Sequence, residues 1–251
     1  MMAKQEEIEE LHFELASESR LSILGELEKK PVKMHELVSR LRLTDTEAFR
    51  QLRRLSEAQL VEKLPDGTYR LTPYAKLVKD NCSPLEFISR HRGYFLEHDA
   101  FLLPREFRSR LDELSGCEYI PTTVGSFNKG TEYFSGAKRI DAVIFGTEAM
   151  IERLRVRIEE GVKMRWLMHE SFLDRAPAVL RKWKTLPEIR VTPEVPGHIL
   201  VTDRAALITI RRHNGEVSYD SFVGEDPSFL KWAGDLFAHE WQKARPWQPW
   251  D

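Results

Sequence analysis

Basic side chains gather in one stretch of the sequence, where they could bind anionic groups. The positive residues between positions 40 and 70 are Arg40, Arg42, Arg50, Arg53, Arg54, Lys63 and Arg70. A guanidinium group is planar and presents its donors as a fixed fork, so it can bind a phosphate or a guanine edge through two hydrogen bonds. The net charge of the chain is only -2, so binding to nucleic acid would depend on a local basic face.

A helix beginning at Thr44 is expected to present several of these side chains. Thr44 and Glu47 form a capping box, in which the hydroxyl and the carboxylate each accept a hydrogen bond from a backbone N–H. Ala48, Leu52 and Leu55 share one face of this helix and predict its buried stripe. The outward face near its N-terminal half then carries Thr46, Phe49, Arg50 and Arg53.

These positions predict two kinds of DNA contact. Arg50 or Arg53 would bond to guanine, and Phe49 would contact a thymine methyl group. Thr44 and Thr46, at the start of the same helix, are included among the predicted DNA-binding residues. The residues better placed for phosphates are Arg40, Arg42, Arg54, Lys63 and Arg70. Two alternatives stay open: a solvated helix face paired with Glu47 and Glu57, and a surface that docks a protein.

The neighbouring elements favour a winged helix-turn-helix over about residues 19–72. Helices are expected over residues 8–15, from Ser19 to Pro31 with Leu21, Leu24 and Leu27 buried, and over residues 34–41. The strands LVEKL and TYRL flank Pro65-Asp66-Gly67, which is typical of a hairpin wing. Gln59 stands before the wing where a glycine is common. We expect it to adopt a left-handed conformation at a cost of roughly 1 kcal/mol, unless the helix ends differently.

The rest of the chain predicts a helical connector and an α/β domain. Helical patterns run from Thr72 to about Ser115, punctuated by Pro84 and Pro104. Strands are expected over residues 140–145, 162–168 and 188–191, in a hairpin HILVTDRAALITI turning at Asp203-Arg204, and over 219–223, with helices over 147–161, 176–184 and 228–245. The predicted domains are residues 1–80, 81–117 and 118–251. The fold class is therefore an α+β winged helix-turn-helix, a helical connector and a C-terminal α/β domain.

Three segments of the sequence resemble a known family. LASESRLSILGEL, LTDTEAFRQLRRLSEAQLVEKLPDGTYRLTPYAKLV and above all PLEFISRHRGYFLEHD look like archaeal winged-helix regulators with the middle domain of methanogenesis regulatory proteins. The resemblance covers nearly the whole chain. It implies an archaeal transcription regulator that binds double-stranded DNA, forms a homodimer and carries an effector domain whose ligand is poorly defined.

The C-terminal domain is also similar to the phospholipase D-like half-domains of sugar-sensing archaeal regulators. Phospholipase D chemistry needs a histidine nucleophile, a lysine two residues later and an aspartate, in the order H-x-K-x(4)-D. His198 is followed by Ile199 and Leu200, so the lysine is missing, and Asp203 comes too early. We expect a sandwich without the catalytic motif and no enzymatic activity. The alternative is a phosphodiesterase or nuclease targeted by the winged helix.

A binding site for a small effector is expected at strand ends of the α/β domain. Gly146, Thr147 and Glu148 could present backbone N–H groups to an anion, or could simply begin a capped helix. The other candidates are Trp166, His169, His198 and Asp203, each of which could equally be structural. His239-Glu240 lacks the second histidine of a zinc protease motif, and no P-loop or dinucleotide pattern occurs, so we expect neither metal nor cofactor.

Composition supports a cytoplasmic protein of two domains. The chain has 251 residues, 41% hydrophobic and 31% charged, with an acidic start and no apolar run long enough for a membrane helix. Its two cysteines, Cys82 and Cys117, lie far apart and indicate no disulfide framework. Apolar stripes that could form a dimer interface, or pack within the chain, comprise Ile8, Leu11, Leu15, Leu85, Ile88 and Phe95.

Overall fold

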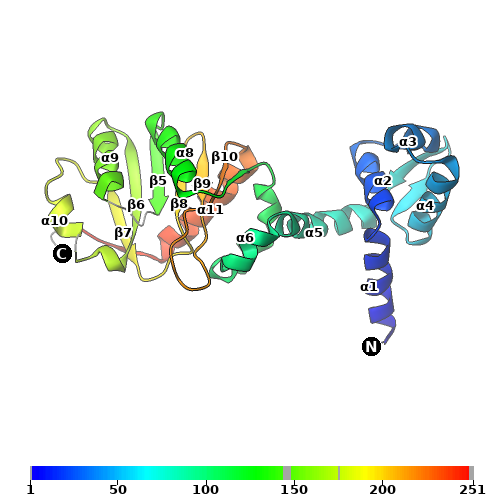
Figure 1. Ribbon diagram of the computed structural model, residues 1–251, viewed down its shortest axis with the longest axis horizontal. Coiled ribbons are helices and arrows are strands. Elements are labelled where there is room, and N and C mark those ends of the chain that lie inside the picture. The colour runs from blue at the N-terminus through cyan, green and yellow to red at the C-terminus, as the bar shows by residue number, and fades with distance from the viewer. Residues whose placement is uncertain (1, 144–147, 175, 249–251) are drawn as a thin grey trace. The chain divides into compact units, whose positions relative to one another are not determined.

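The computed structural model describes residues 2–143, 148–174 and 176–248, and it divides into two compact units (Figure 1). Unit 1 is Met1–Ser83, and unit 2 is Pro84–Asp251. Helix α5 (Pro73–Arg90) contains the boundary between them. None of the described helices is long and apolar enough to span a membrane.

Unit 1 has the element order of a winged helix-turn-helix. Its elements are α1 (Met2–Leu15), α2 (Glu18–Lys29), β1 (Val32–Lys33), α3 (Met34–Leu41), α4 (Asp45–Glu57), β2 (Val61–Lys63), β3 (Thr68–Leu71) and the first part of α5. The strands form an antiparallel sheet in the order β1-β3-β2. Ile23, Leu37, Leu52, Leu55 and Leu60 are buried in its core, so the predicted stripe of α4 is confirmed.

The start of α2 differs from the prediction. Ser17, and not Ser19, occupies the N-cap, while the Ser19 hydroxyl donates to Glu47 of α4 at 3.1 Å. Leu21 is 47% exposed, and Ile23 takes its expected place in the core. The buried face of α2 comprises Arg20, Ile23, Leu24 and Leu27.

Left-handed residues end two of the helices and shape the wing. Gln59 has φ 57°, as expected, and its N–H bonds to Ser56 while Leu60 N–H bonds to Leu55, which is the Schellman pattern after α4. Arg42 adopts φ 54° after α3, which the sequence reading did not anticipate. Gly67 has φ 82° in the predicted turn between β2 and β3.

Unit 2 is built on a mixed sheet of eight strands in the order β11-β7-β6-β5-β8-β9-β10-β4. The strands β5 (Arg139–Val143), β6 (Lys163–His169) and β7 (Glu188–Thr192) are mutually parallel, and the other pairs are antiparallel. The remaining strands are β4 (Glu118–Ile120), β8 (Ile199–Thr202), β9 (Ala206–Ile208), β10 (Ser221–Gly224) and β11 (Arg245–Pro246).

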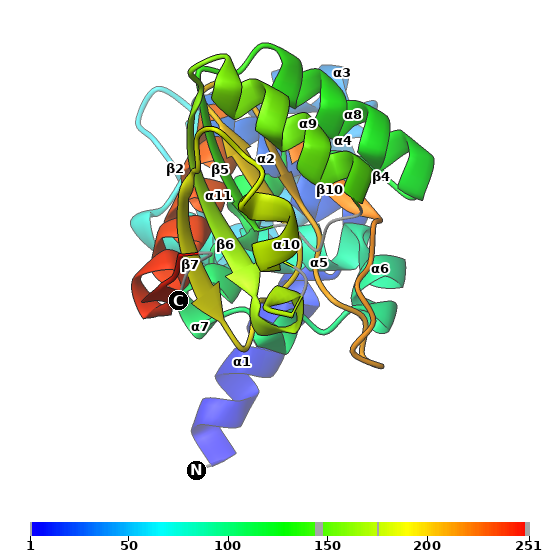
Figure 2. The same cartoon turned by 90° about the vertical axis from the view of Figure 1, so that its left-hand side faces the viewer.

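Helices cover both faces of this sheet (Figure 2). The cluster on one face includes α8 (Thr123–Ser135), α9 (Glu148–Glu159) and α10 (Ala176–Leu180). The other face carries α11 (Pro227–Lys243) and the helical segment before β4. Alternation along β6 explains the two cores, because Trp166 faces the first cluster and Leu167 faces the second.

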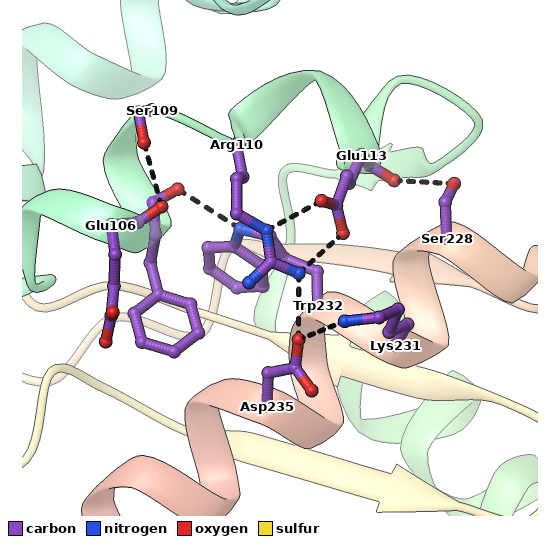
Figure 3. Close-up of polar contacts among 9 residues, drawn as sticks. Glu106, Ser109, Arg110, Glu113, Ser228, Lys231, Trp232 and Asp235 are labelled. Carbon is purple, nitrogen blue, oxygen red and sulfur yellow. Dashed lines mark hydrogen bonds and ion pairs between the residues drawn. The ribbon is translucent and has the colours of Figure 1, made fainter.

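The segment expected as a separate connector packs into the core of unit 2. It contains the end of α5, α6 (Arg92–Glu97), η1 (Ala100–Leu102), α7 (Arg105–Arg108) and η2 (Leu111–Leu114). Trp232 of α11 donates its indole N–H to the Phe107 carbonyl at 3.1 Å, and Arg110 bonds to both Glu113 and Asp235 (Figure 3). These contacts fasten the segment to α11.

Pro84 lies inside α5 and does not end the helix, contrary to the sequence reading. A proline lacks the N–H that would bond to the carbonyl four residues earlier, at Asp80. Asp80 is exposed, so solvent can satisfy that carbonyl. The side chains of Asn81 and Ser83 also bond to the helix backbone, at the Leu77 and Lys79 carbonyls.

Candidate nucleic-acid interface

Helix α4 is capped at its start by one of the two interactions of the predicted capping box. The Thr44 hydroxyl accepts the backbone N–H of Glu47 at 3.2 Å, as expected. The Glu47 carboxylate accepts the Ser19 hydroxyl and so ties α4 to α2. The first turn of the helix remains exposed, and its backbone N–H groups can interact favourably with an anion.

The outward face of α4 presents an aromatic ring and two guanidinium groups. Thr46, Phe49 and Arg50 are exposed, and Phe49 exposes 58% of its surface. Within the described part of the chain, no carboxylate forms an ion pair with Arg50. Arg53 is 70% exposed and pairs with Glu57 one turn later at 2.8 Å. An exposed pair of this kind is weak, so its guanidinium can exchange partners.

Four of the five residues expected to contact phosphate differ in whether a carboxylate already binds them. Arg42 is exposed after α3, and Lys63 is exposed on β2 with its ammonium 5.7 Å from the Tyr69 ring centroid. Arg70 on β3 pairs with Glu62 of β2 at 2.7 Å, with both side chains largely exposed. Arg40 is held between two carboxylates, at 3.1 Å from Glu26 and 2.7 Å from Glu36.

Arg54 is part-buried and belongs to a network around the buried carboxylate of Glu14. Its guanidinium lies 2.5 Å from the Glu14 carboxylate of α1 and 4.9 Å from the Phe13 ring centroid. Hydrogen bonding to Glu14 raises the pKa of Arg54. The same carboxylate pairs with buried Arg20 at 3.0 Å, and Arg20 also bonds to Gln51 of α4. This network fixes α1 and α2 behind α4.

The effector candidates of unit 2 do not gather at one place. His198 and His169 lie at the same edge of the sheet, where β5 and β6 end. His169 is the last residue of β6, and His198 directly precedes β8. The strand register shows this, because Val143 at the end of β5 pairs with Leu167 of β6 and with Ile199 of β8. Asp203 lies at the opposite edge, where its carboxylate accepts the backbone N–H of Lys138 at 2.8 Å. Trp166 is 1% exposed and packs in the core near Trp183. Glu148 begins α9, and Gly146 and Thr147 lie outside the described residues.

Two of these side chains have structural partners. The His169 imidazole accepts the backbone N–H of Ser171 and caps η3 (Glu170–Phe172). His198 is 6% exposed, and its ring centroid lies 5.1 Å from that of Tyr219. Burial lowers the pKa of His198 to about 4, although a hydrogen bond with the Val143 backbone acts in the opposite direction. The His198 imidazole is therefore neutral near pH 7.

The sequence reading missed a cavity in unit 2. Its volume is about 320 Å³, and it is lined by Arg90, His91, Gly93, Tyr94, Glu97, His98, Tyr119 and Asp220. The run SRHRGYFLEHD, which carries the family resemblance, supplies most of this lining, but no motif in it predicts a cavity. Among the described residues, no group of three or more potential metal ligands is close enough to hold an ion.

Comparison with known proteins gives one match to a family model. Residues 8–92 match the family described as HVO_A0261 N-terminal domain. This match covers less than half of the chain, and it includes all of α2, α3, α4 and the hairpin. No curated protein matches the sequence.

Solved structures give weaker likenesses. TrmBL2, described as an archaeal chromatin protein with a novel mode of DNA binding, is 16% identical and has a TM-score of 0.44, with 86% of this chain and 88% of that chain covered. NucT from Helicobacter pylori is 12% identical with a TM-score of 0.41, covering 52% of this chain and 97% of that one. Nuc from Salmonella typhimurium, a phospholipase D family member, is 12% identical with a TM-score of 0.36, covering 49% and 90%. At these values, neither DNA binding nor nuclease activity carries over to this chain.

Proposed function

We propose that this chain is a cytoplasmic transcription regulator of archaeal type, whose unit 1 binds double-stranded DNA. Helix α4 would enter the major groove, and the β2–β3 hairpin would lie against the adjacent backbone, as in other winged helix-turn-helix proteins. The observation that carries the proposal is the outward face of α4. There Thr46, Phe49 and Arg50 are exposed together.

The charges around this face support contact with phosphates. Arg42 is exposed directly after α3, and Lys63 and Arg70 are exposed on the β2–β3 hairpin. Their positions would fix the register of unit 1 on DNA without reading sequence. Arg54 pairs with the buried carboxylate of Glu14, and Arg40 is held by two carboxylates, so we assign both residues to the fold of unit 1 and remove them from the set of phosphate contacts.

Selection of DNA from a random pool by the purified chain tests this proposal. We expect enrichment of a defined sequence, and an affinity for it that falls linearly with salt on logarithmic axes, since phosphate contacts release counterions. A chain that enriches no sequence and binds no DNA even at low salt would contradict the proposal. That result would favour docking of a protein on the same face.

We propose further that unit 2 senses a small molecule or a partner and is not a phosphodiesterase. A histidine nucleophile must meet its substrate and needs a nearby cation for the phosphate. His198 is buried, and Leu200 stands where the motif has lysine. Release of nitrophenol from bis-p-nitrophenyl phosphate, abolished by His198→Ala, would contradict this assignment.

Homodimerisation is part of the same proposal, because two half-sites multiply affinity and specificity for DNA. Leu11 and Leu15 pack on the core of unit 1, and Ile88 and Phe95 pack on that of unit 2, so they serve the fold of the single chain. Apolar side chains of α5 remain exposed: Tyr74 by 46%, and Leu77 and Leu85 by 62% each. The spacing of three positions between Tyr74 and Leu77 places these two side chains of unit 1 on one side of the helix.

A further inference from the structure

The cavity of unit 2 has a wall of aromatic rings. His91 follows α5, Tyr94 lies on α6 and Tyr119 lies on β4, so three elements converge on it. The ring centroid of Tyr119 lies 5.7 Å from that of Tyr94 and 5.9 Å from that of His91, in edge-on arrangements. A volume of about 320 Å³ is at the small end of the range for ligand pockets, which suits one or two fused rings.

Two imidazoles, His91 and His98, belong to this wall. Burial lowers the pKa of both His91 and His98, so both rings are neutral near pH 7. The Nδ1 atom of His98 donates to the Tyr94 carbonyl at 2.8 Å, which leaves its Nε2 as an acceptor. Among the described protein groups, none donates to that Nε2, but the atom is buried, so a ligand in the cavity does not reach it.

His91 is the more accessible of the two imidazoles. Its ring is half-buried and packs at 4.6 Å from Phe87 and 4.9 Å from Phe222, measured between centroids. These contacts hold the ring in place, and a neutral imidazole always leaves one nitrogen able to accept. A ligand in the cavity can therefore meet a fixed acceptor on an aromatic wall.

Charges at the cavity balance one another. Glu97 and Asp220 line it, and Arg212 binds both carboxylates, at 2.9 Å and 3.3 Å. Arg90 adds a positive charge to the lining. With two carboxylates and two guanidinium groups, the site gives little net attraction to an anion or a cation.

We propose that this cavity binds a small, uncharged, planar aromatic or heteroaromatic molecule whose N–H or O–H group donates a hydrogen bond to His91. Binding itself is independent of the DNA interface. Only the role of the bound molecule as an effector rests on the proposed function.

Isosteric probe pairs test the proposal on the full-length chain. Indole and indene have the same shape, but only indole has an N–H donor, and phenol and toluene form a second such pair. Calorimetric titration without DNA should show one site that prefers indole to indene by about tenfold, the size of one well-placed hydrogen bond. Equal affinity within each pair, or no binding by any of the four probes, would overturn the proposal.

Substitutions locate the site. His91→Phe keeps an aromatic ring beside Phe87 and Phe222 but removes the acceptor, so the preference for indole should vanish while indene still binds. A Cβ on Gly93 would meet nothing within 4 Å, so Gly93→Leu has room to fill part of the cavity and should abolish binding of both probes. Gly234→Leu, on α11 with equally free space, is the matched control and should bind as the unaltered chain does.

DNA affinity separates this inference from the proposed function. Indole that binds in the cavity and shifts the affinity for selected DNA supports both. Indole that binds with no shift keeps the site and overturns its role in sensing. A chain that binds indole but no DNA keeps the site and overturns the proposed function.

Discussion

The guanidinium of Arg54 lies 2.5 Å from the carboxylate of Glu14, and this contact joins α4 to the end of α1 across 40 positions of sequence. Glu14 is 5% exposed and also pairs with buried Arg20. The residue that the sequence offered as a phosphate contact therefore supports the helix that presents Arg50. The basic stretch therefore contains both the proposed DNA-binding face and residues that support its helix.

Loss of the Glu14 charge should destabilise unit 1. Glu14→Gln leaves the buried guanidinium of Arg20 without its counter-charge, and breaking a buried pair typically costs about 3 to 5 kcal/mol. Urea denaturation measures the free energy of unfolding, with exposed Glu9→Gln on α1 as the control. A Glu14→Gln variant as stable as the control would show that the pair contributes nothing.

Glycine at position 59 should stabilise unit 1. Gln59 holds φ 57° after α4, and the left-handed conformation costs a residue with a Cβ roughly 1 kcal/mol. Gln59→Gly should raise the free energy of unfolding by about 0.5 to 1 kcal/mol after the entropy that glycine adds to the unfolded chain. Gln59→Ala keeps the Cβ and should give no such gain, so equal effects of the two substitutions would refute the explanation.

Acid should weaken unit 2 through His198. Burial lowers the pKa of its imidazole to about 4, whereas a histidine of the unfolded chain titrates near ~6.5. The unfolded state therefore binds a proton there first, and the free energy of unfolding falls as the pH drops from about 6.5 to about 4. Above about pH 7 the imidazole is neutral in both states, so this loss of stability is absent there.

The slope of stability against pH measures this effect. Removing the titrating group with His198→Gln should reduce the slope between pH 6.5 and pH 5 by up to ~1.4 kcal/mol per pH unit. His213→Gln, at an exposed histidine, should leave it unchanged. The lowered pKa values of His91 and His98 act in the same direction, so a residual slope should persist in His198→Gln.

A charge on the exposed side of α5 should separate the proposed dimer. Light scattering after gel filtration should give the mass of two chains, and Leu77→Glu should shift it towards one chain. Val124→Glu on α8 is the control, because Val124 is also largely exposed, at 71%. A single-chain mass for the unaltered protein, or a dimer unaffected by Leu77→Glu, would rule out this interface.

Local patterns predicted most of the elements. The segment MHELVSRL forms α3 with the predicted bounds, Met34–Leu41, and the hairpin of β2 and β3 turns at Gly67 as expected. These elements depend on neighbouring residues and on backbone conformations that short motifs specify.

Elements that depend on packing were missed. Helix α8 contains Gly125 and Gly130, which weaken the helical pattern, and a Cβ at 125 would meet Ile120 of β4 at 2.7 Å. The contact between Glu14 and Arg54, and the cavity joining residues 90–98 to Tyr119 and Asp220, depend on distant parts of the chain. Hydrophobic periodicity carries no information about such pairs.

The most direct test of the account is the affinity of Arg50→Ala for the DNA sequence that the chain selects. Arg50 is exposed on α4, and we expect Arg50→Ala to weaken binding by about 1 to 3 kcal/mol and to relax the preference at one base pair. Fluorescence anisotropy at fixed salt measures this, with exposed Arg105→Ala of unit 2 as the control. Equal affinities for Arg50→Ala, Arg105→Ala and the unaltered chain would contradict a DNA-reading role for this face.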